Sequence, residues 1–211
     1  MPRTRIKICG IRDEEALYAA IDAGADAVGF VFVQASPRFV RPEQAFDLMG
    51  LLPPMVVGVG VFQDMSVDDF GDIEQICPVH HAQLHGNEDA ETVEDCGPDV
   101  IKAVRFGSET FERDLVMWDE DENVAAILVD GPSAGSGEAL DWAAVARATE
   151  RVVKPLILAG GLTPENVAEA VRTVRPYAVD VSSGVERERG VKDLAKIEAF
   201  CDAVRRADVA G

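Results

Sequence analysis

Two side chains capable of acid–base chemistry stand at the ends of apolar, strand-like runs. Cys9 ends RIKIC (residues 5–9), and Asp130 ends AAILVD (residues 125–130). An extended backbone places Lys7 and Cys9 on one face, where the ammonium group favours the thiolate form of the cysteine. Partial desolvation would raise the pKa of Asp130 and suit it to donate a proton. The pair therefore indicates proton transfer; a buried structural thiol and a helix-capping or lysine-paired aspartate are the alternatives.

Two later apolar runs end in turns rich in glycine and serine. The first contains Gly160 and Gly161, and the second contains Ser182, Ser183 and Gly184. Glycine lets backbone N–H groups approach an anion closely, and serine adds a hydroxyl donor. These five residues are predicted to bind a phosphate group, with ordinary turns as the alternative.

Three further polar residues are candidates for binding a substrate. Arg38 could hold a carboxylate through two parallel hydrogen bonds, although a surface ion pair is the simpler interpretation of Arg38 taken alone. Gln83 and His85 lie at the end of a short strand-like run at residues 81–84. No metal site is predicted around His81 and His85, because the spacing of nearby acidic and thiol groups does not complete a ligand set.

Apolar runs and helical periods alternate eight times along the chain. Strands are predicted at 5–9, 27–33, 55–62, 81–84, 100–105, 125–130, 155–159 and 177–181. Helices are predicted at 13–23, from Pro42, at 66–76, 88–96, 109–118, 142–151, 164–174 after a Thr163 cap, and 192–206. This pattern predicts an α/β fold, a (β/α)8 TIM barrel forming a single domain over residues 1–211, with the chemistry at the carboxyl ends of the strands. An open doubly wound sheet is the alternative, but the first turn lacks the GxGxxG pattern.

Composition excludes several classes of partner. The 211 residues include 38 Asp and Glu against 20 Lys and Arg, a formal charge of -18, which opposes binding to nucleic acid. No apolar stretch approaches the roughly 20 residues of a membrane span, and the chain begins without a signal-peptide core, so we expect a cytoplasmic location. The four cysteines form no CxxC pair and are expected to be free thiols. Only five of the basic residues are lysines, and the acidic excess suggests adaptation to high salt.

With these residues assembled, the sequence resembles the phosphoribosylanthranilate isomerase family of tryptophan biosynthesis. The matching motifs are KICGI (7–11), GFVF (29–32), SPRFV (36–40), QLHG (83–86), IKAV (101–104), LVDG (128–131), LAGGLTPENV (158–167) and VDVSSGVE (179–186). The resemblance implies an Amadori rearrangement of N-(5-phosphoribosyl)anthranilate, an aldose–ketose isomerisation, without a metal or an organic cofactor.

The resemblance also assigns roles to individual residues. Cys9 matches the family's general base and Asp130 its general acid, while Arg38 matches the arginine that contacts the anthranilate carboxylate. Gly161 and the turn at 182–184 match phosphate-binding positions, and Asp180 matches an active-site aspartate of unassigned role. One departure lies after the sixth strand, where the family's GGTG-like loop reads AGSG at residues 134–137.

Two other functions remain open at this point. A related sugar-phosphate isomerase of histidine biosynthesis has a similar barrel, but it carries an aspartate where this chain has Cys9. A catalytically silent phosphate-binding barrel would keep the anion site without turnover. The sequence does not distinguish a monomer from a homodimer.

Overall fold

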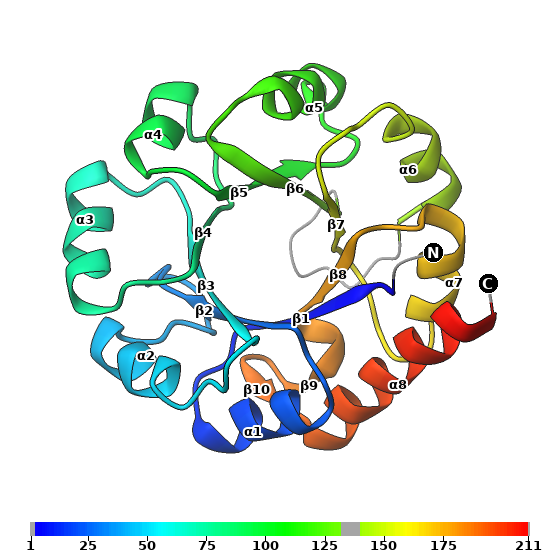
Figure 1. Ribbon diagram of the computed structural model, residues 1–211, viewed down its shortest axis with the longest axis horizontal. Coiled ribbons are helices and arrows are strands. Elements are labelled where there is room, and N and C mark those ends of the chain that lie inside the picture. The colour runs from blue at the N-terminus through cyan, green and yellow to red at the C-terminus, as the bar shows by residue number, and fades with distance from the viewer. Residues whose placement is uncertain (1–2, 132–139, 211) are drawn as a thin grey trace.

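Eight parallel strands form a closed barrel at the centre of the molecule (Figure 1). The structure is a computed structural model that describes residues 3–131 and 140–210. Each strand pairs with the next in sequence order, and β8 pairs with β1 to close the ring. In the described part of the chain, eight α-helices surround the barrel. The predicted (β/α)8 fold is therefore confirmed.

The strands are β1 (Arg5–Cys9), β2 (Ala27–Val31), β3 (Val57–Phe62), β4 (His81–Leu84), β5 (Val100–Arg105), β6 (Val124–Asp130), β7 (Leu156–Leu158) and β8 (Ala178–Val181). The helices are α1 (Glu14–Asp22), α2 (Pro42–Met49), α3 (Val67–Ile76), α4 (Ala90–Asp95), α5 (Phe111–Glu120), α6 (Trp142–Ala148), α7 (Val167–Val174) and α8 (Leu194–Ala210). A 3-10 turn η1 (Ser183–Val185) and two short strands, β9 (Glu186–Glu188) and β10 (Val191–Lys192), follow β8. None of the helices in residues 3–131 and 140–210 has the length and apolar character needed to cross a membrane.

Local sequence explains where several helices begin. The Ser66 hydroxyl accepts a hydrogen bond from the Asp69 N–H and caps α3. Pro42 occupies the first turn of α2, where its missing N–H costs nothing. Asp13 caps α1 by accepting from the Ala16 N–H. These caps fix the directions of helices that cover the barrel.

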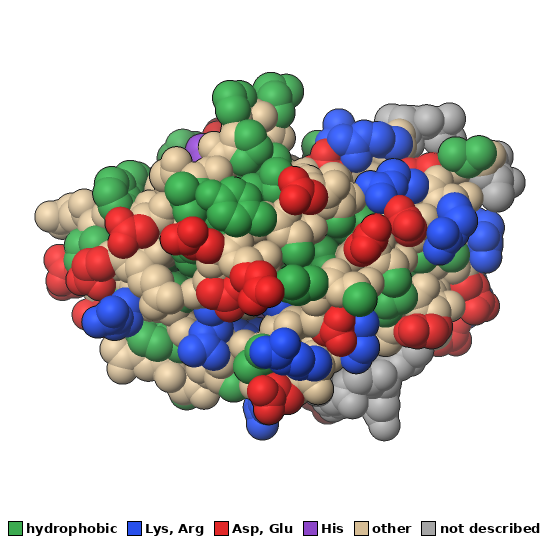
Figure 2. All heavy atoms as spheres, turned by 90° about the horizontal axis from the view of Figure 1, so that it is seen from below, with side chains coloured by type: hydrophobic (Ala, Val, Ile, Leu, Met, Phe, Trp, Pro, Cys, Tyr) green, Lys and Arg blue, Asp and Glu red, His purple; other side chains and the backbone are tan. Residues whose placement is uncertain are grey.

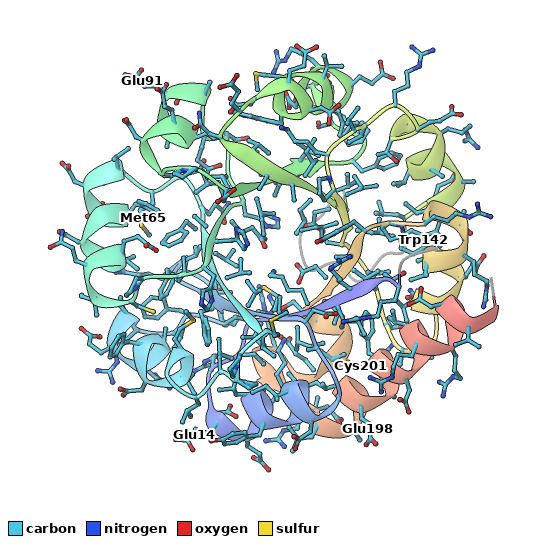
Figure 3. The ribbon with its side chains drawn as sticks, in the orientation of Figure 1. Glu14, Met65, Glu91, Trp142, Glu198 and Cys201 are labelled. Atoms are coloured by element: carbon cyan, nitrogen blue, oxygen red, sulfur yellow. The ribbon has the colours of Figure 1, made fainter. Side chains whose placement is uncertain are left out.

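Apolar side chains fill both the barrel lumen and the layer between strands and helices. The lumen cluster is Val59, Ile101, Ala103, Ala126, Leu128, Ile157, Ala159 and Ala178. Trp142 and Cys201 lie in the outer layer, between their helices and the strands, whereas Glu14, Glu91 and Glu198 point outward (Figure 3). The packed lumen gives the strand ends a rigid base.

Several predicted element boundaries differ from the structure by two to four residues, and three of the predicted starts have a clear local cause. β3 begins at Val57 instead of residue 55, because Met55 has a φ of 77° and is 93 % exposed. α7 begins at Val167 instead of residue 164. Residues 164–166 form a turn, and Asn166, not Thr163, is the residue that precedes the helix. α8 begins at Leu194 instead of residue 192, because the preceding residues form the antiparallel hairpin of β9 and β10. The last two differences both lie beside the candidate site.

Candidate active site

A cavity of about 200 Å³ opens at the carboxyl ends of the strands and gathers all but one of the predicted site residues. Those lining it are Cys9, Arg38, Gln83, His85, Asp130, Gly160, Gly161, Asp180, Ser182 and Ser183. Gly184 lines a neighbouring cavity of about 320 Å³, which shares Gly161 and Ser183 with the first. A cavity of about 610 Å³ at the opposite end of the barrel contains none of them. Residues far apart in sequence therefore meet at one site.

Cys9 ends β1 and faces this cavity, with 7 % of the residue exposed. Its Cα pairs with that of Gly29 on β2, and the Gly29 carbonyl accepts from the N–H groups of Gly10 and Ile11. Burial raises the pKa of the Cys9 thiol more than the positive charge of Lys7 lowers it. Lys7 therefore favours the thiolate, as the sequence predicts, but desolvation outweighs this effect and the net pKa is raised.

Asp130 ends β6 and contacts His85, whose Nε2 lies 3.1 Å from Asp130 Oδ2. The Gly131 N–H donates to Oδ1 at 2.8 Å. Burial alone would raise the pKa of Asp130, but the hydrogen bond and charge of His85, the Gly131 N–H and the charge of Arg105 together hold it below its ordinary value. The predicted upward shift was wrong because hydrogen-bond donors face the carboxylate.

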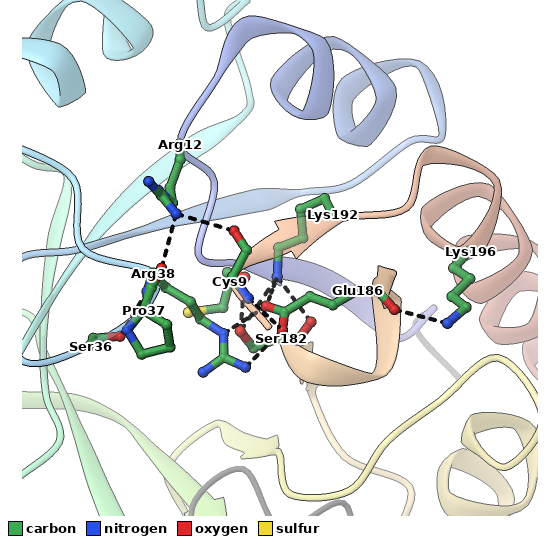
Figure 4. Close-up of polar contacts among 10 residues, drawn as sticks. Cys9, Arg12, Ser36, Pro37, Arg38, Ser182, Glu186, Lys192 and Lys196 are labelled. Carbon is green, nitrogen blue, oxygen red and sulfur yellow. Dashed lines mark hydrogen bonds and ion pairs between the residues drawn. The ribbon is translucent and has the colours of Figure 1, made fainter. Parts of the chain in front are cut away.

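Arg38 is paired with a residue that the sequence analysis did not identify. Its Nε donates to Glu186 Oε1 at 2.7 Å and its Nη2 donates to Glu186 Oε2 at 3.0 Å (Figure 4). Glu186 Oε1 also accepts from Lys192 Nζ at 3.1 Å, and its Oε2 accepts from the Gly190 N–H. Although burial opposes ionisation, Arg38 and Lys192 hold the pKa of Glu186 below its ordinary value. The guanidinium group is thus fixed at the cavity edge by a buried carboxylate.

Lys192 brings a second positive charge to Cys9. Its Nζ donates to the Ser182 carbonyl at 2.9 Å, and the Ser182 hydroxyl donates to the Cys9 carbonyl at 3.1 Å. The lysine charge lowers the pKa of Cys9, and burial lowers the pKa of Lys192 itself. Gly190 turns the chain between β9 and β10 with a φ of 84°. A glycine between two short extended segments is the signal in the sequence that could have predicted this hairpin.

The glycine and serine turns also line the cavity. Gly160 has a φ of 82°, and a Cβ there would lie 2.4 Å from the Gly131 nitrogen. A Cβ on Gly184 would lie 1.8 Å from the Leu162 carbonyl oxygen, so this turn also requires glycine. Asn166 braces the first turn by donating from Nδ2 to the Gly161 carbonyl at 2.8 Å. The two turns are consequently held close together.

Other predicted features can be placed briefly. All four cysteines are free thiols. Within the described ranges, no three histidine, cysteine or carboxylate side chains are grouped so that they could hold a metal ion. The AGSG segment at 134–137, where the sequence departs from the family pattern, lies outside the described residues.

Comparison with known proteins places the chain in one family. Residues 6–203 match the family described as N-(5'phosphoribosyl)anthranilate (PRA) isomerase. An N-(5'-phosphoribosyl)anthranilate isomerase of Pseudomonas fluorescens is 46% identical over 97% of this chain and 100% of its own length.

Two solved structures agree. The phosphoribosyl anthranilate isomerase of Thermotoga maritima is 39% identical, with a TM-score of 0.87 over 96% of this chain and 99% of its own. A phosphoribosyl anthranilate isomerase solved with reduced 1-(o-carboxyphenylamino)-1-deoxyribulose 5-phosphate is 38% identical, with a TM-score of 0.85 and the same coverage. The chain belongs to the N-(5'-phosphoribosyl)anthranilate isomerase family.

Proposed function

We propose that this chain catalyses the Amadori rearrangement of N-(5-phosphoribosyl)anthranilate to 1-(2-carboxyphenylamino)-1-deoxyribulose 5-phosphate in tryptophan biosynthesis. The observation that carries the proposal is the single cavity that joins Cys9, Asp130, Arg38 and the two glycine- and serine-containing turns. A relative of similar sequence binds a reduced analogue of that product. The site offers an acid, a base and two anion anchors, which the reaction needs.

Asp130 acts as the general acid. Its carboxyl group gives a proton to the ribose ring oxygen, and the C1′–O bond breaks to leave a protonated Schiff base. The electron pair of that bond stays on oxygen, which becomes the C4′ hydroxyl. Because hydrogen-bond donors hold the pKa of Asp130 low, the protonated carboxyl group is a minor form in the free protein, and the carboxylate that remains after it gives up its proton is well stabilised.

Cys9 acts as the general base. The Schiff base withdraws electrons and acidifies the C2′ proton, which the Cys9 thiolate removes to give an enolamine that tautomerises to the ketone. Burial keeps the thiolate a minor form in the free protein, and once formed it is a stronger base than an ordinary thiolate. The charges of Lys7 and Lys192 favour its formation.

Two anchors hold the substrate across the acid and the base. Arg38 binds the anthranilate carboxylate, and Glu186 fixes the orientation of its guanidinium plane. The phosphate binds at Gly160, Gly161 and the turn at residues 182–184. Gln83, His85 and Asp180 line the cavity between the anchors. Holding both ends of the substrate supplies the positioning that proton transfer alone lacks.

A steady-state assay tests this function. The fluorescence of the anthranilate–sugar substrate should fall with wild-type protein, and Cys9→Ala or Asp130→Asn should lower kcat by about 10²-fold or more in a folded protein. Turnover of only the histidine-pathway aminoaldose substrate would favour the related isomerase. Binding of phosphate compounds without turnover of either substrate would favour a silent barrel.

The same proposal includes a single-domain, cytoplasmic enzyme that acts on a small molecule, with no nucleic-acid or membrane partner. Its assembly is a monomer or a homodimer, which sedimentation equilibrium distinguishes. The net charge of -18 supports the exclusion of nucleic acid.

A further inference from the structure

A chain of side-chain contacts crosses the barrel lumen from Lys7 to Asp130. Lys7 Nζ lies 2.8 Å from Gln83 Oε1, and Gln83 Nε2 lies 2.8 Å from His85 Nδ1. His85 Nε2 then lies 3.1 Å from Asp130 Oδ2. Lys7 and Gln83 are 3 % and 1 % exposed, so protein groups, and not bulk water, determine how these atoms pair.

The chemistry of each group fixes the direction of every hydrogen bond in the chain. A lysine ammonium group can only donate, so the oxygen of the Gln83 amide must face Lys7. The amide nitrogen therefore faces His85, and because it too can only donate, Nδ1 of His85 must accept. The ring proton of neutral His85 consequently lies on Nε2 and is donated to Asp130.

Lys7, the first residue of this hydrogen-bonded row, is itself held in place. Asp180 Oδ1 lies 3.0 Å from Lys7 Nζ, and the Cα atoms of the two residues are partners across β1 and β8. Burial lowers the pKa of Lys7, but the charge and hydrogen bond of Asp180, with Cys9, outweigh it and leave the pKa raised. Lys7 thus stays charged and continues to donate. Asp180 thereby has a structural role in the site, as the partner that keeps Lys7 ionised.

We propose that Lys7 and Gln83 are positioning residues that hold the His85 proton on Nε2, so that His85 always presents a donor to Asp130. The functional part of this inference rests on the proposed role of Asp130 as the general acid. With Nε2 occupied and Nδ1 engaged by Gln83, the imidazole ring offers no lone pair to Asp130. The Asp130 proton therefore passes to the substrate and not to His85, and the His85 N–H stabilises the carboxylate that remains.

The tautomer of His85 can be measured without any assay of activity. The chain has three histidines, so ¹⁵N-histidine labelling gives a spectrum in which each ring nitrogen can be assigned by replacing His80 and His81 with Gln in turn. At pH 8.5, where an ordinary imidazole is neutral, His85 should carry its proton on Nε2. A proton on Nδ1 of His85 in the wild-type protein would overturn the proposal.

His81 provides an internal reference for the opposite tautomer. Its Nδ1 lies 2.9 Å from the carbonyl oxygen of Asp99, which can only accept, so its proton should lie on Nδ1. His80 Nδ1 accepts from the Gly58 N–H at 2.9 Å and should resemble His85. The same spectrum thus contains both forms.

Gln83→Glu is the decisive variant, because it changes the hydrogen-bond direction with almost no change in shape. A glutamate accepts from Lys7 with one oxygen and from His85 with the other, so the Nδ1 of His85 should acquire a proton. Gln63→Glu is the matched control. It adds the same charge to the same cavity, but Gln63 is not part of the hydrogen-bonded row from Lys7 to Asp130, so the His85 tautomer should be unchanged. An unchanged His85 spectrum in Gln83→Glu, with native circular dichroism, would refute the proposal.

Kinetics separate this inference from the proposed function. Gln83→Glu should lower kcat at least tenfold while KM changes less than threefold, and Gln83→Met, which has no amide, should lie between it and wild type. If wild-type protein does not convert the anthranilate substrate, the proposed function fails. The tautomer measurement still tests whether Lys7 and Gln83 hold the His85 proton on Nε2. If wild type is active and Gln83→Glu has the wild-type kcat, the tautomer of His85 has no role in catalysis.

Discussion

Glu186 holds Arg38 by two parallel hydrogen bonds, at 2.7 and 3.0 Å, that use the Nε and Nη2 edge of the guanidinium group. A planar fork held at one edge keeps a fixed orientation, so its remaining donors are preorganised. The carboxylate comes from β9, a strand that is absent from the simple alternation of strands and helices. The hairpin after β8 therefore supplies the carboxylate that orients Arg38 at the cavity.

Glu186→Gln should weaken the two hydrogen bonds that orient the Arg38 guanidinium group. We expect KM for the anthranilate substrate to rise roughly tenfold, the size of one charge-assisted hydrogen bond, with a smaller change in kcat. Glu188→Gln, an exposed carboxylate on the same strand, is the control and should behave as wild type. Equal effects of the two variants in a steady-state titration would show that Glu186 has no special role in orienting Arg38.

Cys9 should react slowly with an alkylating reagent at neutral pH. Burial raises its pKa, so the thiolate fraction, and with it the reaction rate, should continue to rise above the pH at which an ordinary thiol is half ionised, about 8.5. Mass spectrometry of the Cys9 peptide after timed exposure to iodoacetamide measures the rate at each pH. A rate that levels off below pH 8 would contradict the raised pKa.

Gly29→Ala should disturb Cys9 directly. A Cβ at this position would lie 2.8 Å from Cys9 Sγ and 3.1 Å from its Cα, so the thiol must move. We expect a loss of about 1–3 kcal/mol in the free energy of unfolding, from overpacking, and a marked fall in kcat. Gly71→Ala in α3 is the control: a Cβ there meets nothing within 4 Å, and urea unfolding should show a gain of about 0.5–1 kcal/mol. Equal kcat values for the two variants would argue against a strict position for the thiol.

Concentrated salt should stabilise the protein. Acidic side chains are spread over the face in Figure 2, and the formal charge of -18 implies self-repulsion that mobile ions screen. The thermal midpoint should therefore be higher in 2 M KCl than in dilute buffer. A midpoint no higher in KCl would reject adaptation to high salt.

The sequence predicts the barrel and most of the cavity because periodicity and strand ends are local signals. Cys9, Asp130 and the two turns stand directly after apolar runs, and a parallel barrel brings such positions together at one end. Contacts between distant segments are not local signals of this kind: Gly190 indicates a turn, but it does not show which residues the hairpin contacts. The pairing of Arg38 with Glu186 depends on how a hairpin folds back over the barrel.

Electrostatic environment was the other property that local sequence could not determine. Lys7 stands two residues from Cys9, yet burial outweighs its effect on the pKa of the thiol. Asp130 ends an apolar strand, yet His85, which directly follows β4, helps to reverse the predicted shift. In both cases the net pKa depends on the balance between desolvation, charge and hydrogen bonding, and the neighbours that set this balance are supplied only by the folded chain.

The contact between Lys7 and Asp180 joins the first strand of the barrel to the last. Ser182 likewise connects the end of β8 to the Cys9 carbonyl. The cavity is thus complete only when β1 and β8 have paired, and this pairing closes the ring. During refolding, catalytic activity would return with ring closure and would not precede it, so the enzyme's own turnover reports when its barrel has closed.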